Sequence, residues 1–115
     1  MADSTFIYLF RGGAAATLSP EAMQANMQRW ASWVEGLAKE GRTRGGDPLE
    51  LTGKVVSANG KSITDGPYAE AKDVVGGYLL VIARDLAHAA ELSRGCPIFE
   101  YGGTVEVRPT RPMTP

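Results

Sequence analysis

The sequence is poor in the residues that bind metals or form disulfides. It has one cysteine, Cys96, and one histidine, His88, among 115 residues. One thiol cannot form a disulfide within the chain, and these two side chains cannot complete a metal coordination shell without several carboxylates. The glycine pairs at 12–13 and 76–77 lack the flanking pattern of a phosphate-binding loop. We therefore expect no metal site and no cofactor, and a reducing compartment.

The chain also lacks an excess of charge and a long apolar run. Its 12 Lys and Arg residues are scattered and balanced by 13 Asp and Glu residues. The electrostatic attraction that dominates nucleic-acid binding is therefore missing. No apolar run approaches the roughly 20 residues that span a bilayer, and Met1-Ala2-Asp3 begins no basic leader sequence. We expect a cytoplasmic protein that binds neither nucleic acid nor membrane.

The first third of the chain predicts a strand followed by a long helix. Residues 5–11 are rich in aromatic and β-branched side chains and predict a strand that is apolar on both faces. Ser19-Pro20-Glu21 predicts a capped helix start, and Gly41 can end the helix. A single apolar stripe is expected to bury this helix on the core. The stripe comprises Met23, Met27, Trp30, Val34 and Leu37, with Asn26 and Trp33 on its flank.

The remaining residues predict four more strands and a short helix. Residues 49–58 and 61–64 flank Asn59-Gly60 and predict a β-hairpin. Residues 78–83 form a nearly continuous apolar run, which is typical of a central strand, and residues 104–108 predict the last strand.

A second helix is predicted between Asp85, which can cap it, and Gly95-Cys96-Pro97, which would stop it. Its narrow inner face is expected to hold Leu86, Ala90 and Ser93, with His88 on the surface. The complete order is ferredoxin-like βαββαβ with an extra hairpin. It predicts a single α+β domain over residues 1–115, with both helices on one face of an antiparallel sheet.

The apolar residues exceed what two helices can cover. At least two strands are apolar on both faces, whereas both helices are expected on one face of the sheet. A second copy of the chain is the simplest cover for the other face. We therefore expect a homodimer whose interface carries Tyr78 and Leu80, or alternatively Leu79 and Val81.

Several short motifs are similar to those of a known family. Asp65-Gly66-Pro67-Tyr68-Ala69-Glu70, followed by Gly76-Gly77-Tyr78, resembles the signature of the YCII-related family, DGPF-type group. Residues 46–49 (GDPL), 95–97 (GCP) and 102–109 (GGTVEVRP) also resemble that group. The likeness covers essentially the whole chain, with Tyr68 in place of the signature phenylalanine. It implies a dimeric α+β barrel of ferredoxin-like protomers and little about activity, because most of the family has no assigned function.

The resemblance also bears on catalysis. Some relatives use a His–Asp pair with histidine on the first helix, but the matching position here is Asn26. Asparagine cannot act as a general base near neutral pH. Asp65 is therefore the candidate catalytic acid or base. Alternatively, its side chain forms an Asx turn that only holds the loop.

Five further residues are candidate ligand contacts: Asn26, Trp30, Trp33, Tyr68 and Glu70. Each has a simpler structural interpretation. Asn26 and the two tryptophans could form a packed helix face with one polar edge, Tyr68 could fill the core, and Glu70 could be a solvated residue.

Two functional hypotheses remain open. One is a protein that binds a small molecule in a pocket near the Asp65 loop, and that could be a cofactor-free lyase or isomerase. The other is a non-catalytic interaction or regulatory module whose loop is purely structural. A concave pocket holding Asp65 and Asn26 would favour the first, and a filled core would favour the second.

Overall fold

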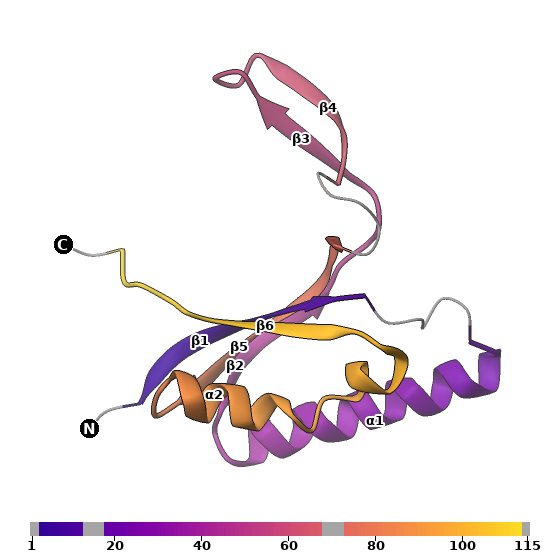
Figure 1. Ribbon diagram of the computed structural model, residues 1–115, viewed down its shortest axis with the longest axis vertical. Helices are drawn as coiled ribbons and strands as arrows, with labels where there is room; N and C mark the ends of the chain where they lie inside the picture. Colours follow the sequence, from indigo (N-terminus) through magenta and orange to yellow (C-terminus); the bar gives the residue numbers. More distant parts are fainter. Residues whose placement is uncertain (1–2, 13–17, 68–72, 114–115) are drawn as a thin grey trace.

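The structure is a computed structural model of the 115-residue chain, and it describes residues 3–12, 18–67 and 73–113. Its main sheet contains β1 (Ser4–Arg11), β2 (Thr43–Pro48), β5 (Val75–Ala83) and β6 (Thr104–Pro109). The strand order is β2-β5-β1-β6, and all neighbours are antiparallel. Helices α1 (Pro20–Lys39) and α2 (Leu86–Ser93) lie together on one face (Figure 1). The predicted ferredoxin-like α+β fold is confirmed.

Strand β2 is one of the elements that the sequence did not predict. Its six residues, TRGGDP, contain two glycines and a proline, a composition typical of a turn. The strand forms because Gly46 permits a very close approach to β5, where a Cβ atom would overlap the carbonyl oxygen of Tyr78. A register shift between Thr43 and Gly46 absorbs an extra residue, with Gly45 at a φ of +99°.

The hairpin predicted around Asn59-Gly60 is confirmed. Strands β3 (Gly53–Ser57) and β4 (Ser62–Gly66) pair as a separate two-stranded sheet. The first strand is shorter than the predicted 49–58, because residues 49–52 and Ala58 lie outside it. Figure 1 shows the hairpin standing away from the main sheet, on the side opposite α1 and α2.

Helix α1 begins and ends as predicted. The Ser19 side chain accepts a hydrogen bond from the backbone N–H of Ala22 at 3.2 Å. At the other end, Gly41 has a φ of +71°, and the N–H of Arg42 donates to the carbonyl of Leu37 at 2.9 Å. These contacts satisfy backbone groups that a helix end leaves unpaired.

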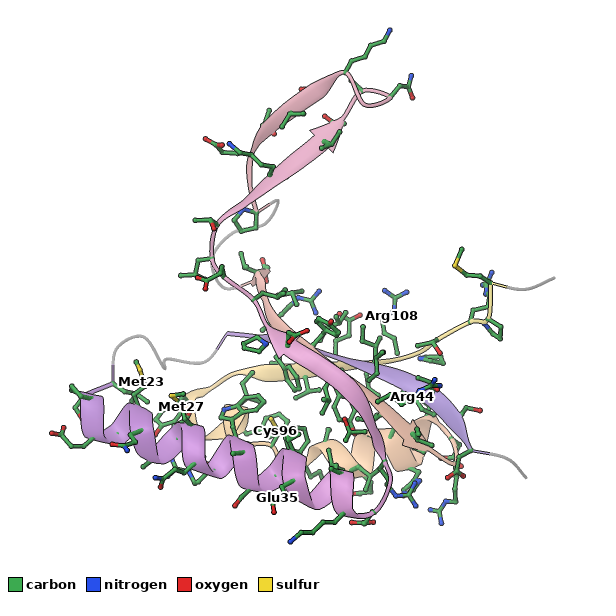
Figure 2. The ribbon with its side chains drawn as sticks, turned by 180° about the vertical axis from the view of Figure 1, so that it is seen from behind. Met23, Met27, Glu35, Arg44, Cys96 and Arg108 are labelled. Atoms are coloured by element: carbon green, nitrogen blue, oxygen red, sulfur yellow. The ribbon has the colours of Figure 1, made fainter. Side chains whose placement is uncertain are left out.

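The predicted burial of α1 is only partly right. Leu37 is buried, and Trp30 and Val34 pack against the core, but Met27 is 64% exposed. Asn26, expected on the flank of the stripe, is one of the two buried residues of the helix. Met23 and Met27 lie on the N-terminal half of the helix (Figure 2). This half of the apolar stripe is therefore not buried against the sheet.

The inner face of α2 differs from the prediction. Ala89 and Ser93 are buried, whereas Leu86 is 48% exposed and Ala90 is exposed. The Tyr8 hydroxyl donates a hydrogen bond to the carbonyl oxygen of Ala89 and fixes which side of the helix faces the sheet. Ser93 was correctly assigned to the inner face.

His88 has a local structural contact. The Nδ1 atom of the His88 ring accepts a hydrogen bond from the backbone N–H of Arg84 at 3.0 Å. The backbone N–H of His88 donates to Asp85 Oδ1 at 2.8 Å. These two bonds satisfy backbone donors at the start of α2, where Asp85 is the predicted cap.

The core lies between the helices and one face of the sheet. Tyr8 and Val81 are its largest fully buried side chains. Tyr8 stacks on Trp33 at a centroid distance of 6.0 Å, and Phe10 meets Trp30 edge-on at 5.0 Å. These aromatic contacts join α1 to β1.

No helix in the described part of the chain is both long enough and apolar enough to cross a bilayer.

Two glycine substitutions test the close approach of β2 to β5. Gly46→Ala is expected to lower the free energy of unfolding by about 1–3 kcal/mol, because the added methyl group must displace backbone. Gly36→Ala is the control, since a Cβ atom on this α1 residue meets nothing within 4 Å. Alanine there should raise the free energy of unfolding by about 0.5–1 kcal/mol. Urea denaturation measures both, and equal effects would contradict the close approach.

The buried tyrosine and cysteine predict a loss of stability at alkaline pH. Burial raises the pKa of Tyr8 to about 12, with a smaller contribution from Cys96, and burial raises the pKa of Cys96 to about 11. The ordinary pKa is 10.0 for a tyrosine hydroxyl and 9.0 for a cysteine thiol. Because the folded state favours the neutral forms, their stabilisation is complete below pH 9 and is lost as the pH rises from 9 to 12.

The variant Tyr8→Phe distinguishes the contribution of Tyr8 to this pH dependence from that of Cys96. At pH 7 it should lower the free energy of unfolding by about 1 kcal/mol, because the hydroxyl bond to Ala89 is lost. Above pH 10 the variant should lose stability less steeply than the wild type. Urea denaturation at several pH values measures this difference, and parallel pH profiles would contradict the assignment to Tyr8.

Candidate functional site

A cavity of about 500 Å³ lies between α1 and one end of the main sheet. It is bounded by α1, by the ends of β1, β2 and β5, and by the 3-10 helix η3 (Pro97–Tyr101). The described residues that line it are Phe10, Gly12, Asn26, Met27, Trp30, Val34, Gly46, Asp47, Pro48, Gly76, Gly77, Tyr78, Leu79, Ile98 and Tyr101.

Glycines on the sheet side help to leave this space empty. Gly46, Gly76 and Gly77 all line the cavity and have no side chains to fill it. A Cβ atom on Gly77 would lie 3.7 Å from the Phe10 ring and 3.2 Å from the carbonyl oxygen of Asp47. Glycine is therefore required at position 46 by the close approach of the β5 backbone and is favoured at position 77.

Asn26 provides the buried polar group of the cavity. The residue is 5% exposed, and its Nδ2 atom has no hydrogen-bond partner among the described residues. A buried donor without a partner costs about 1–3 kcal/mol of stability. Such a group in a cavity is suited to donate a hydrogen bond to a bound molecule.

The other walls are mainly apolar and aromatic. Phe10 and Trp30 meet at an interplanar angle of 86°, and Val34, Leu79 and Ile98 also line the space. No described ion pair includes a residue of this cavity. A cavity of this composition is suited to a small molecule with a large apolar part.

Asp47 is the only carboxylate among the described lining residues. It accepts a hydrogen bond from the Tyr78 hydroxyl, with 3.2 Å between oxygen atoms. This bond and the charge of Asp47 raise the pKa of Tyr78. Because side chains alternate along a strand, Tyr78 points to the face opposite the buried Leu79. The Asp47–Tyr78 pair therefore lies at the edge of the cavity on the side away from the helices.

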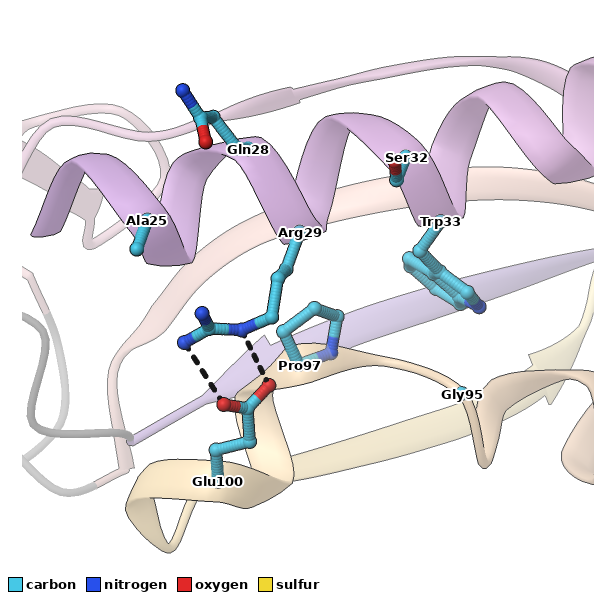
Figure 3. A pocket seen from close by; sticks show the side chains of 8 residues that line it. All are labelled: Ala25, Gln28, Arg29, Ser32, Trp33, Gly95, Pro97 and Glu100. Carbon is cyan, nitrogen blue, oxygen red and sulfur yellow. Dashed lines mark hydrogen bonds and ion pairs between the residues drawn. The ribbon is translucent and has the colours of Figure 1, made fainter. Parts of the chain in front are cut away.

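Trp33 meets the Trp30 ring edge-on at 5.9 Å but does not line the cavity. Its ring stacks on Tyr8 and lines a shallow hollow on the outside of the molecule, between α1 and η3 (Figure 3). The ion pair between Arg29 and Glu100, at 2.9 Å, bridges the same two elements. This hollow is separate from the Asn26 cavity, so only one of the two candidate tryptophans lines that cavity.

The structure does not bring Asp65 to the cavity of its own chain. Asp65 lies on β4, its side chain is 87% exposed, and its carboxylate forms an ion pair with Lys54. Tyr68 and Glu70 fall outside the described residues. Of the predicted site residues, Asn26 and Trp30 line the cavity; Trp33 packs against Trp30 without lining it, and Asp65 lies on the hairpin.

Sequence reasoning missed several residues of the cavity wall. Met27 and Val34 were expected in a packed stripe, and Ile98 gave no signal. The available signal was the pair of glycine motifs, because Gly46-Asp47-Pro48 and Gly76-Gly77-Tyr78 together form the sheet side of the cavity. In the described residues, no three His, Cys, Asp or Glu side chains gather closely enough to hold a metal ion.

Comparison with known proteins identifies the family. A search of curated proteins finds no match. The family model described as the YCII-related domain matches residues 6–114. Assignment to the DGPF-type group within that family stays a prediction. The match covers nearly the whole chain and agrees with the observed fold, and the chain therefore belongs to the YCII-related domain family.

Proposed function

We propose that the protein binds a small, mainly apolar molecule in the Asn26 cavity. The Nδ2 atom of Asn26 supports this most directly, because it is a buried donor without a partner among the described residues, and Asn26 lines this mainly apolar cavity. The ligand would offer an acceptor, such as a carbonyl oxygen, to this amide. Its apolar part would lie against Phe10 and Trp30, whose rings favour aromatic partners.

A lyase or isomerase reaction at this site would need a group that moves a proton. Asp47 is the only carboxylate among the described lining residues, and its partner Tyr78 is a hydroxyl donor. Asp47 is therefore a better placed acid or base than Asp65 for chemistry within one copy of the chain. Binding is the function that the cavity supports best, because Asp47 lies at its edge and not beside Asn26.

We also propose that the protein is a homodimer. The sheet face away from the helices carries five apolar side chains that are only partly buried: Ile7, Leu9, Tyr78, Leu80 and Ile82. We call this set the open face. Leu79 and Val81 are buried beneath the helices, so of the two predicted interfaces only the one with Tyr78 and Leu80 is accessible. A contiguous apolar face of this kind favours association.

The alternative function, a non-catalytic interaction module, is favoured by one observation. Asp65 is highly exposed and is paired with Lys54 instead of lining a pocket. A structural role for the loop is compatible with ligand binding at Asn26, so the two hypotheses differ only in whether the cavity is used.

Replacing Asn26 tests the cost of its buried amide. Asn26→Leu keeps a similar side-chain shape and removes the unpaired donor, so it should raise the free energy of unfolding by about 1–3 kcal/mol. Gln24→Leu is the matched control, because it makes a similar change at an exposed position of α1. The control should change stability by less than about 0.5 kcal/mol. A destabilised Asn26→Leu protein would contradict the unpaired state of the amide.

Two probe molecules test the proposed ligand chemistry. Acetophenone carries an aromatic ring and one carbonyl, and isopropylbenzene has nearly the same shape without the acceptor. Wild-type protein should bind acetophenone about fivefold more tightly, since one hydrogen bond contributes about 1 kcal/mol. In Asn26→Leu this preference should disappear. Calorimetric titration measures the affinity of both proteins for each probe. If the wild-type protein binds neither probe, the proposed site is rejected.

A charged residue on the open face tests the dimer. Leu80→Arg should convert the protein to a monomer at micromolar concentration, because an unpaired charge would be buried in the interface. Leu86→Arg is the matched control on the exposed part of α2. Sedimentation velocity measures both, and a wild-type protein that sediments as a monomer would refute the proposal.

A further inference from the structure

The β3–β4 hairpin, called the arm here (residues 53–66), has an apolar face that its own chain leaves uncovered. Val56 is paired with Ile63, and Lys54 is paired with Asp65. Directly opposed residues share one face of a sheet. Val56 is 59% exposed and Ile63 is 66% exposed. Because an isolated two-stranded hairpin is at best marginally stable in water, this face requires a surface to pack against.

We propose that the arm packs its Val56–Ile63 face against a second copy of the chain. This inference rests on the homodimer proposed above. The arm rises from the sheet on the side opposite both helices (Figure 1). The second copy would lie on that same side if the open faces meet. Sheets that pack face to face are about 10 Å apart, whereas a five-residue strand is about 17 Å long. The arm is therefore long enough to run alongside the second copy.

The interface area also favours a contribution from the arm. Four strands spaced about 4.8 Å apart and about 20 Å long give a footprint of about 400 Å² on each copy. Two such footprints reach only about 800 Å², the upper limit of most crystal contacts. Each arm would add about 160 Å² of its own face and cover a similar area of the other copy. The total then enters the range of about 1,200–2,000 Å² found in specific interfaces.

Charge on the open side suggests where the arm lies. Arg108 pairs with Ile7 in the sheet register, and Arg44 donates to the Thr5 hydroxyl, so both arginines lie on the side away from the helices (Figure 2). Neither forms an ion pair with a described residue. Asp65 lies on the apolar face of the arm, and among the described residues it is paired only with the exposed Lys54. Exposed pairs contribute little. The carboxylate can therefore turn to an arginine of the second copy.

The position of these arginines fits one type of twofold symmetry. The arm is inserted between the end of β2 at Pro48 and the start of β5 at Val75. Arg44 is near the start of β2, and Arg108 is near the end of β6, so both lie toward the opposite end of the sheet. A twofold axis that runs across the strands, between the two sheets, would bring the arm of each copy to the arginines of the other.

The first test removes the apolar face of the arm. The double variant Val56→Ser/Ile63→Ser should raise the dimer dissociation constant at least tenfold in sedimentation experiments over a concentration series. The control, Leu86→Ser/Phe99→Ser, removes two side chains that are similarly exposed but lie outside the arm. It should change the constant less than threefold. An arm variant that dimerises as tightly as the control would overturn the proposal.

The second test detects the arm on the other copy directly and does not depend on how the first variant folds. Full-length Lys61→Cys is labelled with a nitroxide at the tip of the arm, because the buried Cys96 is protected from the reagent. Labelled protein is mixed with unlabelled protein enriched in ¹⁵N. Amide signals of Arg44 and Arg108 in the unlabelled copies should broaden more than that of Leu86.

The outcomes separate the two proposals. A wild-type protein that is monomeric at micromolar concentration refutes both the dimer and the arm contact. A dimeric wild type with no selective broadening at Arg44 and Arg108 refutes the arm contact alone. Selective broadening together with the weakened Val56→Ser/Ile63→Ser dimer supports both proposals.

Discussion

The aromatic cluster between α1 and β1 determines where the two layers of the protein touch and where they separate. Phe10 and Tyr8 of β1 meet Trp30 and Trp33 of α1, with ring centroids 5.0–6.2 Å apart. On the C-terminal side of these contacts, Leu37 is fully packed. On the N-terminal side, Met27 stays exposed, and the glycines of β2 and β5 supply no side chains. The cavity is therefore a consequence of how the rings support the helix over a glycine-rich end of the sheet.

The buried amide of Asn26 lowers the stability of this arrangement. A buried donor that has no partner among the described residues lowers stability, and a leucine of similar shape would avoid that cost. Proteins keep such unfavourable groups mainly where function requires them. The same reasoning applies to the exposed Val56–Ile63 pair of the arm and to the uncovered apolar face of the sheet. Each of these features is unfavourable in an isolated chain, and the proposed ligand or second copy would relieve that cost.

Much of the fold was predictable because local signals agreed with the tertiary structure. Ser19-Pro20, Asp85 and Asn59-Gly60 each define a boundary by their own backbone chemistry, and those boundaries are observed. Strand β2 was not predictable, since a TRGGDP segment becomes a strand only through contact with β5. The site was half predicted for a related reason. Helical spacing and family likeness placed Asn26 and Trp30, but the positions of Asp65 and Trp33 depend on hairpin direction and helix rotation, which no local pattern records.

The proposed site requires the Asn26 amide to donate a hydrogen bond to a carbonyl compound that binds in the cavity. The most direct measurement is the ¹H–¹⁵N signal of the Asn26 side-chain amide during titration with acetophenone, assigned by its absence in Asn26→Leu. We predict that this signal shifts downfield and saturates together with the ring-proximal signals of Trp30. If the Trp30 signals shift while the Asn26 amide does not, or if neither responds, the claim is contradicted.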